Sequence, residues 1–501
     1  MKKKKIVYNF LVGILGQIIT ILLGLILPKF FITSFGSEVN GLVASVTQIY
    51  VYVNLLEAGV GTATLQALYK PIALNDKDEV NSILSATSIY YKKTGILYFL
   101  AVIFLSIIFP LVFKTNIDKL TIFLVVLFSG LSGVINYFFQ GKYRILLEAE
   151  GKNYILMSLS TIITIVISIV KIILIVNGYD VVVVQLSFFI INLIQVFVIG
   201  YIIQKDYKWI DLKVKPNFES ISQKKSVLVH QVSFMIFSNT DILILTIFTN
   251  FKVVSVYALY NQFFKAIAQL LSIANNSATF ALGQLYNKSK SRFIEMIDCN
   301  EFLFFVASFS CYTTLFICII PFMEIYTVGF TDINYIDINL AILFLLIEVC
   351  KVAKPVMNTV VTVAGHFKQT SNRAIIEMMI NLITSLIGVY YYGIYGVLIG
   401  TILALLYRSN DFIIYANKTI MERTPFKTYK RLLLNIVLMV VVIMISNNFM
   451  ILFNGYLDFF IKGLIMFVLI SFIYISFNSV VFVDDVKGIA KLVGTRIKKN
   501  N

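Results

Sequence analysis

Three ionisable residues and a proline interrupt the apolar segment LFLLIEVCKVAKPVMN at residues 343–358. Glu348, Lys351 and Lys354 follow one another at intervals of three, which places them on one face of a helix and allows Glu348 and Lys351 to pair. Pro355 removes a backbone hydrogen bond to the previous turn and predicts a kink at this point. Each ionisable group costs roughly 2.5–3.5 kcal/mol at the centre of a membrane-spanning helix, so we expect the group to have a use.

We interpret this segment as the cationic wall of an aqueous cavity, on which Glu348 orients or partly neutralises a lysine. The structural alternative is a salt bridge that tolerates burial. A phosphate within ~4 Å of a lysine gains about 4 kcal/mol at an effective dielectric constant near 20. Because lysine is a flexible point charge, it suits a phosphate group that must be bound and then released.

A second polar stripe lies on the apolar stretch 253–286, where Gln262 and Lys265 share one helix face. Hydrogen bonding between neighbouring helices is an equally good explanation of this stripe. Lys29 stands at the outer end of the first apolar stretch. The predicted substrate-binding residues are therefore Lys351, Glu348, Lys354, Lys265, Lys29 and Gln262.

Acidic and amide side chains in two other apolar stretches are candidates for binding a coupling ion or a proton. SNTDIL contains Asn239 and Asp241, and NLLEAGVGTA contains Glu57. Asp241 could alternatively pair with Lys29. Buried carboxylates in membrane helices usually mark ion or proton pathways.

The composition indicates a membrane protein without a metal centre. The chain has 501 residues, of which 59% are hydrophobic and 14% charged, and its mean hydropathy is +0.87. Soluble domains are nearer a quarter charged. The net charge of +16 indicates basic loops that face anionic lipid, and not a nucleic-acid partner. Two histidines cannot build a multi-histidine metal site, and no cofactor is predicted.

Apolar stretches long enough to cross a bilayer recur along the whole chain. MKKKK and the long apolar run after it predict a retained signal-anchor helix. If both termini are cytoplasmic, most of the 42 basic residues fall in inner loops, which favours a plasma-membrane protein with this orientation. Fourteen spans are predicted, at residues 6–34, 39–68, 93–113, 119–141, 154–177, 181–204, 226–250, 253–286, 295–321, 335–365, 372–392, 394–417, 431–453 and 456–483.

Sparse matches at a nearly constant offset suggest that the chain repeats itself. Val39 matches Val253, and the turn at Gly178 precedes a similar turn at Gly393. The predicted fold is all-α, with two six-helix bundles of parallel topology and two additional C-terminal helices. The domains expected are an N-terminal lobe at 1–205, a cytoplasmic linker at 206–225, a C-terminal lobe at 226–417, and two helices with a basic tail at 418–501.

No motif of an enzyme is present in the sequence. It contains neither a G-x-x-x-x-G-K-[ST] phosphate loop nor a nucleophile elbow, and its loops are too short to hold a soluble active site. We therefore expect a transporter that is not an enzyme.

Several stretches together resemble a known family. FGSEVNGL, LLEAGVGTA, LLEAEGKNY, SNTDILIL and NTVVTVAGHFKQT with IIEMMINLITSLIG resemble the Wzx-type polysaccharide flippases of the multidrug/oligosaccharidyl-lipid/polysaccharide exporter superfamily. The resemblance covers nearly the whole chain. It implies two six-helix lobes that work by alternating access on an undecaprenyl-diphosphate-linked oligosaccharide, such as a capsule, O-unit or teichoic-acid precursor. Glycosyltransferases and a polymerase of the same pathway are the implied partners, together with membrane lipids.

Three alternatives stay open. A lipid II flippase would also have fourteen spans. A cation-coupled drug exporter of the same fold would need an acidic cavity, whereas the candidate residues have a slight positive excess. A membrane polysaccharide polymerase or ligase would need a large outer loop, which is absent.

Overall fold

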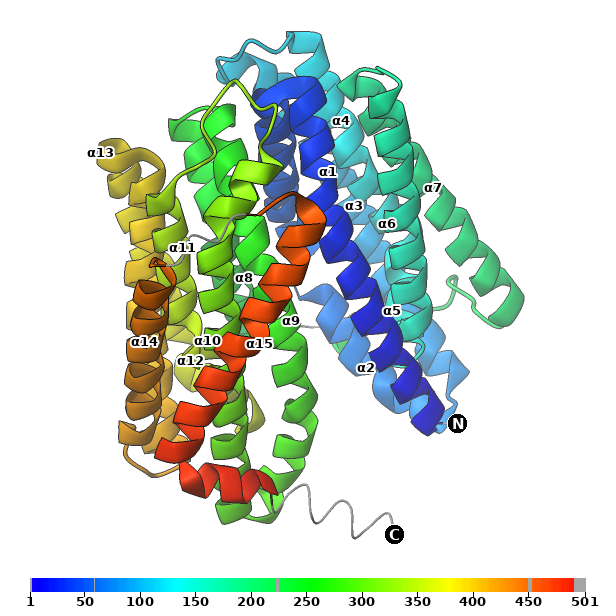
Figure 1. The fold of residues 1–501 in the computed structure, drawn as a ribbon. Coiled ribbons are helices and arrows are strands. Elements are labelled where there is room, and N and C mark those ends of the chain that lie inside the picture. Colours follow the sequence, from blue (N-terminus) through cyan, green and yellow to red (C-terminus); the bar gives the residue numbers. More distant parts are fainter. Residues whose placement is uncertain (1, 58, 222–224, 449–452, 491–501) are drawn as a thin grey trace. The chain divides into compact units, whose positions relative to one another are not determined.

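The computed structural model describes residues 2–57, 59–221, 225–448 and 453–490, and every regular element in these ranges is a helix (Figure 1). The basic tail at 491–501 lies outside the described residues. The helices of the N-terminal half are α1 (Lys2–Val53), η1 (Asn54–Glu57), α2 (Val60–Leu74), α3 (Lys77–Val112), α4 (Lys119–Ile135), η2 (Asn136–Gln140), α5 (Gly141–Ala149), α6 (Asn153–Val176), α7 (Val181–Asp206) and η3 (Glu219–Ile221). They are followed by α8 (Lys225–Phe248), α9 (Phe251–Lys288), α10 (Lys290–Tyr326), α11 (Ile338–Lys351), α12 (Ala353–Val363), α13 (Phe367–Tyr415), η4 (Ala416–Ile420), α14 (Phe426–Ser446) and α15 (Tyr456–Val481).

The helices confirm an all-α protein that crosses the membrane many times. Ten helices in the described part of the chain are long and apolar enough to span a bilayer. Two of them, α1 and α13, each contain a break at a glycine with positive φ, Gly36 (81°) and Gly393 (56°), and so correspond to two predicted spans each. The remaining predicted spans match α9 and the consecutive helices α11 and α12.

A close approach of two glycines makes the sharp turn inside α13 possible. A Cβ atom on Gly396 would lie 2.0 Å from the carbonyl oxygen of Gly388, so a side chain at this position would force the two arms apart. Gly393 lies between these two residues and takes the left-handed conformation that favours glycine. YYYGIYG therefore forms the tight turn that the two predicted spans require.

Some polar segments predicted as loops are helical. α2 continues to Leu74 and α3 begins at Lys77, so residues 77–92 extend the helix well before the predicted span at 93. Asp76 caps α3 by accepting a hydrogen bond from the backbone N–H of Glu79 at 3.0 Å. Hydropathy detects only the apolar part of such a helix, which is why its polar extension was missed.

The chain forms two compact units. Unit 1 comprises residues 1–259 and 330–333, and unit 2 comprises residues 260–329 and 334–501. The division of the chain into lobes at residues 206–225 stays a prediction.

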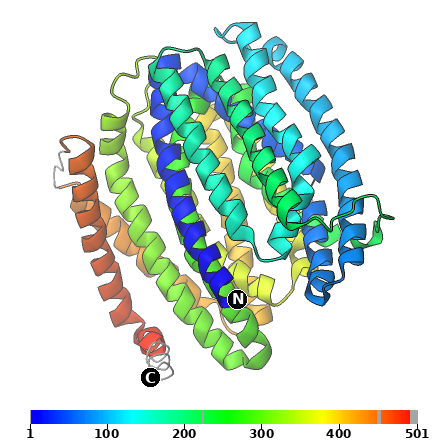
Figure 2. The same ribbon diagram turned by 90° about the vertical axis from the view of Figure 1, so that its right-hand side faces the viewer.

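Unit 1 is a bundle in which α1 packs on α6, α3 on α4, and α4 on α7. Figure 2 shows α3 and α4 side by side as a helical hairpin. Leu42, Val102, Val125 and Val184 are completely buried in its core. α8 also packs on α1, where Ser45 and Thr246 share a hydrogen bond of 2.7 Å.

The segment between α7 and α8 is bound to the N-terminal part of α3. The Asn81 side chain donates to the Trp209 carbonyl at 3.2 Å, and Ser85 donates to the carbonyls of Leu212 and Val214 at 3.0 Å. The backbone N–H of Asn217 donates to the Ser82 carbonyl at 3.1 Å. The predicted linker is therefore fixed to unit 1 by hydrogen bonds over much of its length.

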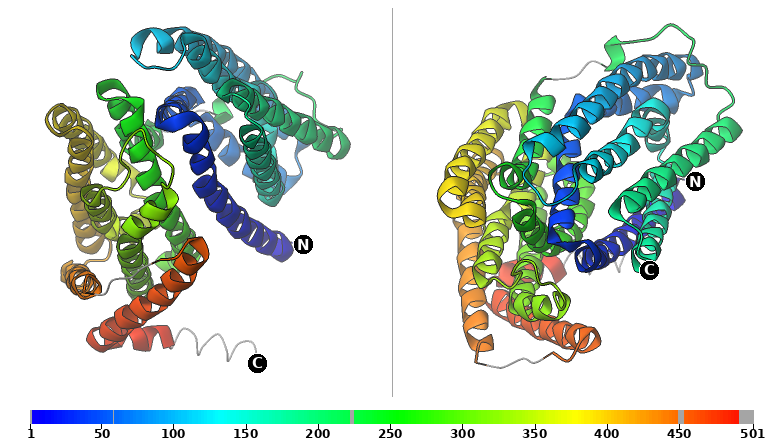
Figure 3. Two further views of the ribbon diagram at one scale, coloured as in Figure 1. Left: turned by 45° about the horizontal axis from the view of Figure 1, so that its top comes forward. Right: turned by 90° about the horizontal axis from the view of Figure 1, so that it is seen from above.

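In unit 2, α13 packs on α11 and α12, and the two C-terminal helices pack on α10. Figure 3 shows α15, coloured orange-red, running along α10. Asn435 of α14 and Asn478 of α15 exchange two side-chain hydrogen bonds of 3.1 and 2.9 Å. Thr313 of α10 and Tyr474 of α15 share another, of 2.9 Å. Such buried polar pairs fix the rotation of neighbouring membrane helices.

Candidate functional site

The segment that contains Glu348, Lys351 and Lys354 is divided into two helices close to Pro355. α11 ends at Lys351 and α12 begins at Ala353. The N–H of Val352 reaches only three residues back, to the Val349 carbonyl at 3.3 Å. Because Pro355 has no N–H, the Lys351 carbonyl loses its usual helical donor. The predicted break therefore lies within one turn of Pro355.

Glu348 and Lys351 form the predicted pair. Lys351 Nζ lies 2.7 Å from Glu348 Oε1, and Tyr312 Oη donates to Glu348 Oε2 at 2.8 Å. The Glu348 side chain is 7% exposed and the Lys351 side chain 34%. Glu348 is thus held by a cation and a hydroxyl, while Lys351 keeps part of its surface open.

Lys354 pairs with a residue of another helix. Its Nζ pairs with Glu377 of α13, a residue that was not among the predicted ones. Arg408 Nε lies 3.3 Å from the other oxygen of Glu377, and its guanidinium also pairs with Asp411 at 2.7 Å. Asp411 in turn pairs with Arg373. We call Lys354, Glu377, Arg408, Asp411 and Arg373 the α12–α13 ion chain.

The α12–α13 ion chain was missed because three of its four pairs join residues far apart in the sequence, on α12 and α13 or on the two arms of α13, and only Arg408 and Asp411 are spaced by three. Glu377 is the single ionisable residue of the apolar stretch IIEMMI, whereas Arg408 and Asp411 stand three residues apart in LLYRSND. The available signal was the presence of these charged residues in apolar sequence, because ionisable residues rarely remain unpaired in a membrane.

Lys265 carries a charge without an acidic partner. Its side chain is exposed, and no carboxylate in the described part of the chain pairs with it. It lies close enough to Lys351 for the two like charges to repel each other. Gln262, one turn earlier on α9, is half-buried. Unit 2 therefore contains one lysine without an acidic partner among the described residues, Lys265, and a second lysine, Lys351, whose charge is paired with Glu348.

The remaining predicted residues lie in unit 1, where the two carboxylates each accept a hydrogen bond from a tyrosine. Tyr91 Oη donates to Glu57, and Tyr257 Oη donates to Asp241 Oδ2 at 2.8 Å. Asn239 donates to the Met235 carbonyl of its own helix at 2.7 Å. Lys29 is half-buried. The roles proposed for these residues stay predictions.

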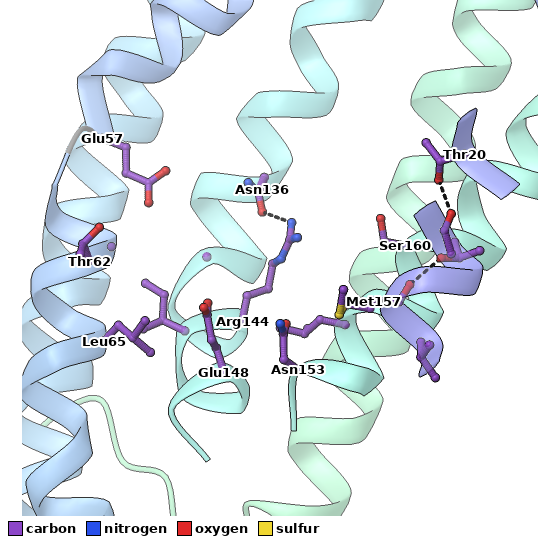
Figure 4. Close-up of a pocket in the computed structure, with 18 of the residues that line it drawn as sticks. Thr20, Glu57, Thr62, Leu65, Asn136, Arg144, Glu148, Asn153, Met157 and Ser160 are labelled. Carbon is purple, nitrogen blue, oxygen red and sulfur yellow. Dashed lines mark hydrogen bonds between the residues drawn. The ribbon is translucent and has the colours of Figure 1, made fainter. Parts of the chain in front are cut away.

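Glu57 lines a cavity of about 610 Å³ inside unit 1, which we call the Glu57 cavity (Figure 4). Arg144 and Glu148 of α5 also line it, and Figure 4 shows Arg144 projecting toward Asn136. Arg144 Nη1 lies 3.5 Å from Asn136 Oδ1. η2, which carries Asn136, is a π-helical turn, and such turns occur frequently at functional sites.

A second cavity of about 500 Å³, also inside unit 1, shares Asn136 and Arg144 with the first. Lys171 of α6 and Gln185 of α7 line it, so we call it the Lys171 cavity. Sequence reasoning did not select Arg144, Glu148 or Lys171 as site residues. Lys171 stands near the end of the predicted span 154–177, where a lysine can usually extend to the membrane surface, but the structure buries it, with 7% exposed.

Comparison with known proteins identifies the fold. No family model matches the sequence, and no curated protein is significantly similar to it. Among solved structures, the lipid II flippase MurJ in an inward closed conformation has a TM-score of 0.67 and 16% identity, covering 96% of this chain and 100% of that one. An inward-facing MATE multidrug resistance transporter of the MOP superfamily has a TM-score of 0.59 and 14% identity, covering 79% and 93%.

The MATE multidrug transporter DinF-BH gives a similar result, with a TM-score of 0.59, 15% identity, and coverage of 84% of this chain and 97% of that one. The chain therefore has the fold of the MOP-superfamily transporters. At these identities the likeness describes the fold and not the substrate.

Proposed function

We propose that the protein is a flippase that moves an undecaprenyl-diphosphate-linked oligosaccharide from the inner to the outer leaflet by alternating access. The observation that carries this proposal is the pair of lysines in unit 2: Lys265 has no carboxylate partner among the described residues, and Lys351, although paired with Glu348, keeps 34% of its side chain exposed. Each lysine would gain about 4 kcal/mol from a phosphate at ~4 Å. A diphosphate offers one phosphate to each lysine. The fold shared with MurJ, whose name describes a lipid flippase, supports the same proposal.

In this proposal Lys351 and Lys265 bind the diphosphate, and Glu348 orients Lys351. Lys354, Gln262 and Lys29 complete the substrate-binding set. Glu57, Asp241 and Asn239 are the candidates for a coupling ion or proton. The substrate would come from membrane glycosyltransferases, and a polymerase would consume it in the outer leaflet.

The double variant Glu348→Gln/Lys351→Met separates a transport site from a structural pair. A neutral replacement of a buried pair is often tolerated, so we expect a folded protein at normal abundance in the membrane. We expect transport of the lipid-linked repeat to be lost, because Lys351 no longer receives phosphate. If the double variant is normally abundant and transports nearly as well as the wild type, the pair of Glu348 and Lys351 has a structural role and does not bind the substrate. Lys351→Arg is the matched control, because it keeps the charge and should retain part of the activity.

A deletion strain tests the class of function. Lipid-linked repeats should be made on the inner leaflet and fail to reach the outer leaflet. If repeats reach the outer leaflet but are not joined to one another, the protein is a polymerase or ligase and the proposal is wrong.

Lipid II is the second candidate substrate, because the MurJ structure covers 96% of this chain and is itself covered completely. Reconstituted protein offered lipid II and a lipid-linked oligosaccharide separately distinguishes the two. Transport of a cationic dye, without transport of either lipid, would instead favour a drug exporter of this fold.

We also propose that both termini are cytoplasmic and that the membrane is the plasma membrane, on the basis of the basic loops. Single cysteines at residues 178, 330 or 454 of a cysteine-free variant should react with an impermeant thiol reagent in intact cells. Cysteines at residues 150, 215 or 290 should be protected. Reversed labelling at two of these positions would overturn the orientation.

A further inference from the structure

Lys171 is a buried cation whose charge is not balanced by a carboxylate. Its side chain is 7% exposed, and among the residues that the structure describes no Asp or Glu pairs with it. Its Nζ lies 3.5 Å from Gln185 Oε1 and above the rings of Phe31 and Phe188, at 5.5 and 4.8 Å from their centres. The rings and the amide oxygen stabilise the ammonium group only in part, because none of them carries a full negative charge.

Gln185 contributes a second group that lacks a protein partner. Its side chain is 2% exposed, and its Nε2 atom makes no hydrogen bond with any described residue. Buried donors are almost always hydrogen-bonded, so a donor without a protein partner indicates a bound ligand or water. Lys171 Nζ and Gln185 Nε2 both belong to side chains that line the Lys171 cavity.

The charge of the Lys171 cavity has one sign. Lys171 and Arg144 line it, and no carboxylate does so within the described part of the chain. The other polar side chains of its wall are mainly amides and hydroxyls, including Gln140, Asn192 and Gln195. In the Glu57 cavity, by contrast, Arg144 faces Glu57 and Glu148. Arg144 therefore has carboxylates near it in the Glu57 cavity, and Lys171 is the cation of the Lys171 cavity whose charge no described carboxylate balances.

We propose that the Lys171 cavity is a binding site for an anion of the phosphate class, with Lys171 as its charged anchor and Gln185 as its neutral donor. A water molecule takes about 30 Å³ of liquid, so 500 Å³ has room for a phosphate or diphosphate with several waters. Lys171 and the amide donors of the wall, among them Gln185, offer the several hydrogen bonds that a phosphate group accepts. The anion is either free in solution or the head group of a lipid-linked diphosphate.

This site is separate from the lysines of unit 2 that carry the proposed function, and its test is equilibrium binding to the whole protein without transport. Purified protein is heated with inorganic pyrophosphate, and with chloride at equal ionic strength. We expect pyrophosphate to raise the melting temperature with a saturable dose dependence, and chloride to have a much smaller effect.

Two variants assign the effect to the site. Lys171→Met should abolish the shift caused by pyrophosphate without lowering the melting temperature of the protein alone, because it removes a buried charge that lacks an acidic partner. Gln185→Leu keeps that charge and should weaken pyrophosphate binding roughly tenfold, the loss expected for one charge-assisted hydrogen bond. Lys119→Met, at an exposed lysine of the same unit, is the matched control and should bind like the wild type.

Nanodiscs that contain undecaprenyl diphosphate identify the source of the anion. If the lipid stabilises the wild type but not Lys171→Met, and pyrophosphate has no effect, the anion is the lipid head group. If pyrophosphate stabilises the wild type but not Lys171→Met, and the lipid has no effect, the anion is free in solution. The proposal is overturned if neither probe stabilises the wild type, or if Lys171→Met binds both probes as well as the wild type does. If Lys171→Met does not fold, unchanged binding by Gln185→Leu overturns it as well.

Discussion

Two buried cations, Lys171 in unit 1 and Arg431 in unit 2, have opposite surroundings. Arg431 is fully buried and reaches Glu301 at 2.6 Å, Asp298 at 3.5 Å and Asp485. Lys171 is nearly as buried but has two aromatic rings and an amide oxygen around it. A cation whose charge is balanced by protein carboxylates can hold helices together, whereas one without such a balance is suited to bind an anion from outside the protein.

Arg431 belongs to a balanced group of six residues. Three carboxylates and three cations, contributed by α10, by the segment from Arg423 to α14, and by the residues after α15, pair with one another. We call this group the α10–α14 ion cluster; its members are Asp298, Glu301, Arg423, Lys427, Arg431 and Asp485. The cluster explains how the two C-terminal helices are attached to α10. It also shows that basic residues predicted to mark the inner side of the membrane can stabilise the fold.

The largest effect that the comparison predicts is that of Arg431→Met. The substitution leaves Glu301 and Asp485 buried without their main cation, which costs about 3–5 kcal/mol. Thermal unfolding of the purified protein should show a large loss of stability, whereas Lys171→Met should show none. Lys430→Met, at the neighbouring exposed lysine, is the control and should change little. If Arg431→Met and Lys171→Met destabilise the protein equally, the inference that Arg431 stabilises the fold and Lys171 does not is wrong.

An intermediate effect is expected for Tyr312→Phe. The variant removes the hydroxyl that donates to Glu348 at 2.8 Å and leaves Lys351 as the partner of this carboxylate. Hydrogen bonds to charged groups contribute about 1.5–3 kcal/mol, so the free energy of unfolding should fall by about that amount.

Tyr474→Phe is the matched control for this intermediate effect. It removes an equally buried hydroxyl whose partner, Thr313, is neutral, at 2.9 Å. The loss should be smaller, about 0.5–1.5 kcal/mol. If Tyr474→Phe is the more harmful of the two, the hydrogen bond from Tyr312 to Glu348 does not stabilise the protein more than one between two neutral hydroxyl groups.

The smallest effect is expected at a cluster that lies outside the spans of unit 1. Lys152 pairs with Glu150 at 2.8 Å and donates to Tyr207 at 2.7 Å, and Tyr207 donates to Glu150 at 2.6 Å. Tyr207 is buried, but the side chains of the ion pair itself are partly exposed, and exposed ion pairs contribute at most about 1 kcal/mol. Lys152→Met should therefore lower the free energy of unfolding by less than about 1 kcal/mol.

The pH dependence of this small effect can be worked out from the same contacts. Burial lowers the pKa of Lys152, but the hydrogen bonds and charges of Glu150 and Tyr207 outweigh it and raise the pKa above the ordinary 10.5. Burial and the hydrogen bond to Glu150 raise the pKa of Tyr207 to about 12. Both raised values favour the protonated forms, so the stabilisation is present below about pH 10 and is lost as the pH rises through the raised values. The difference between Lys152→Met and the wild type should be constant from about pH 6 to pH 9; a steep change in that interval would contradict the assignment.

The sequence by itself determined the features that depend only on residues close to one another along the chain. Apolar runs of sufficient length predicted the membrane helices, because crossing a bilayer requires about 20 apolar residues whatever the tertiary structure. Pro355 located the break after α11 through the hydrogen bond that it cannot make, and the spacing of Glu348 and Lys351 predicted their pairing within one helix.

Only the tertiary structure decided which charges meet across helices. Lys354 pairs with Glu377 of another helix, although its spacing pointed to the face of Glu348. Lys171 is buried in unit 1, because α1 and α7 place Phe31 and Phe188 around it. Contacts of this kind depend on how helices rotate and pack against one another, and hydropathy and spacing along a single helix contain no information about that rotation.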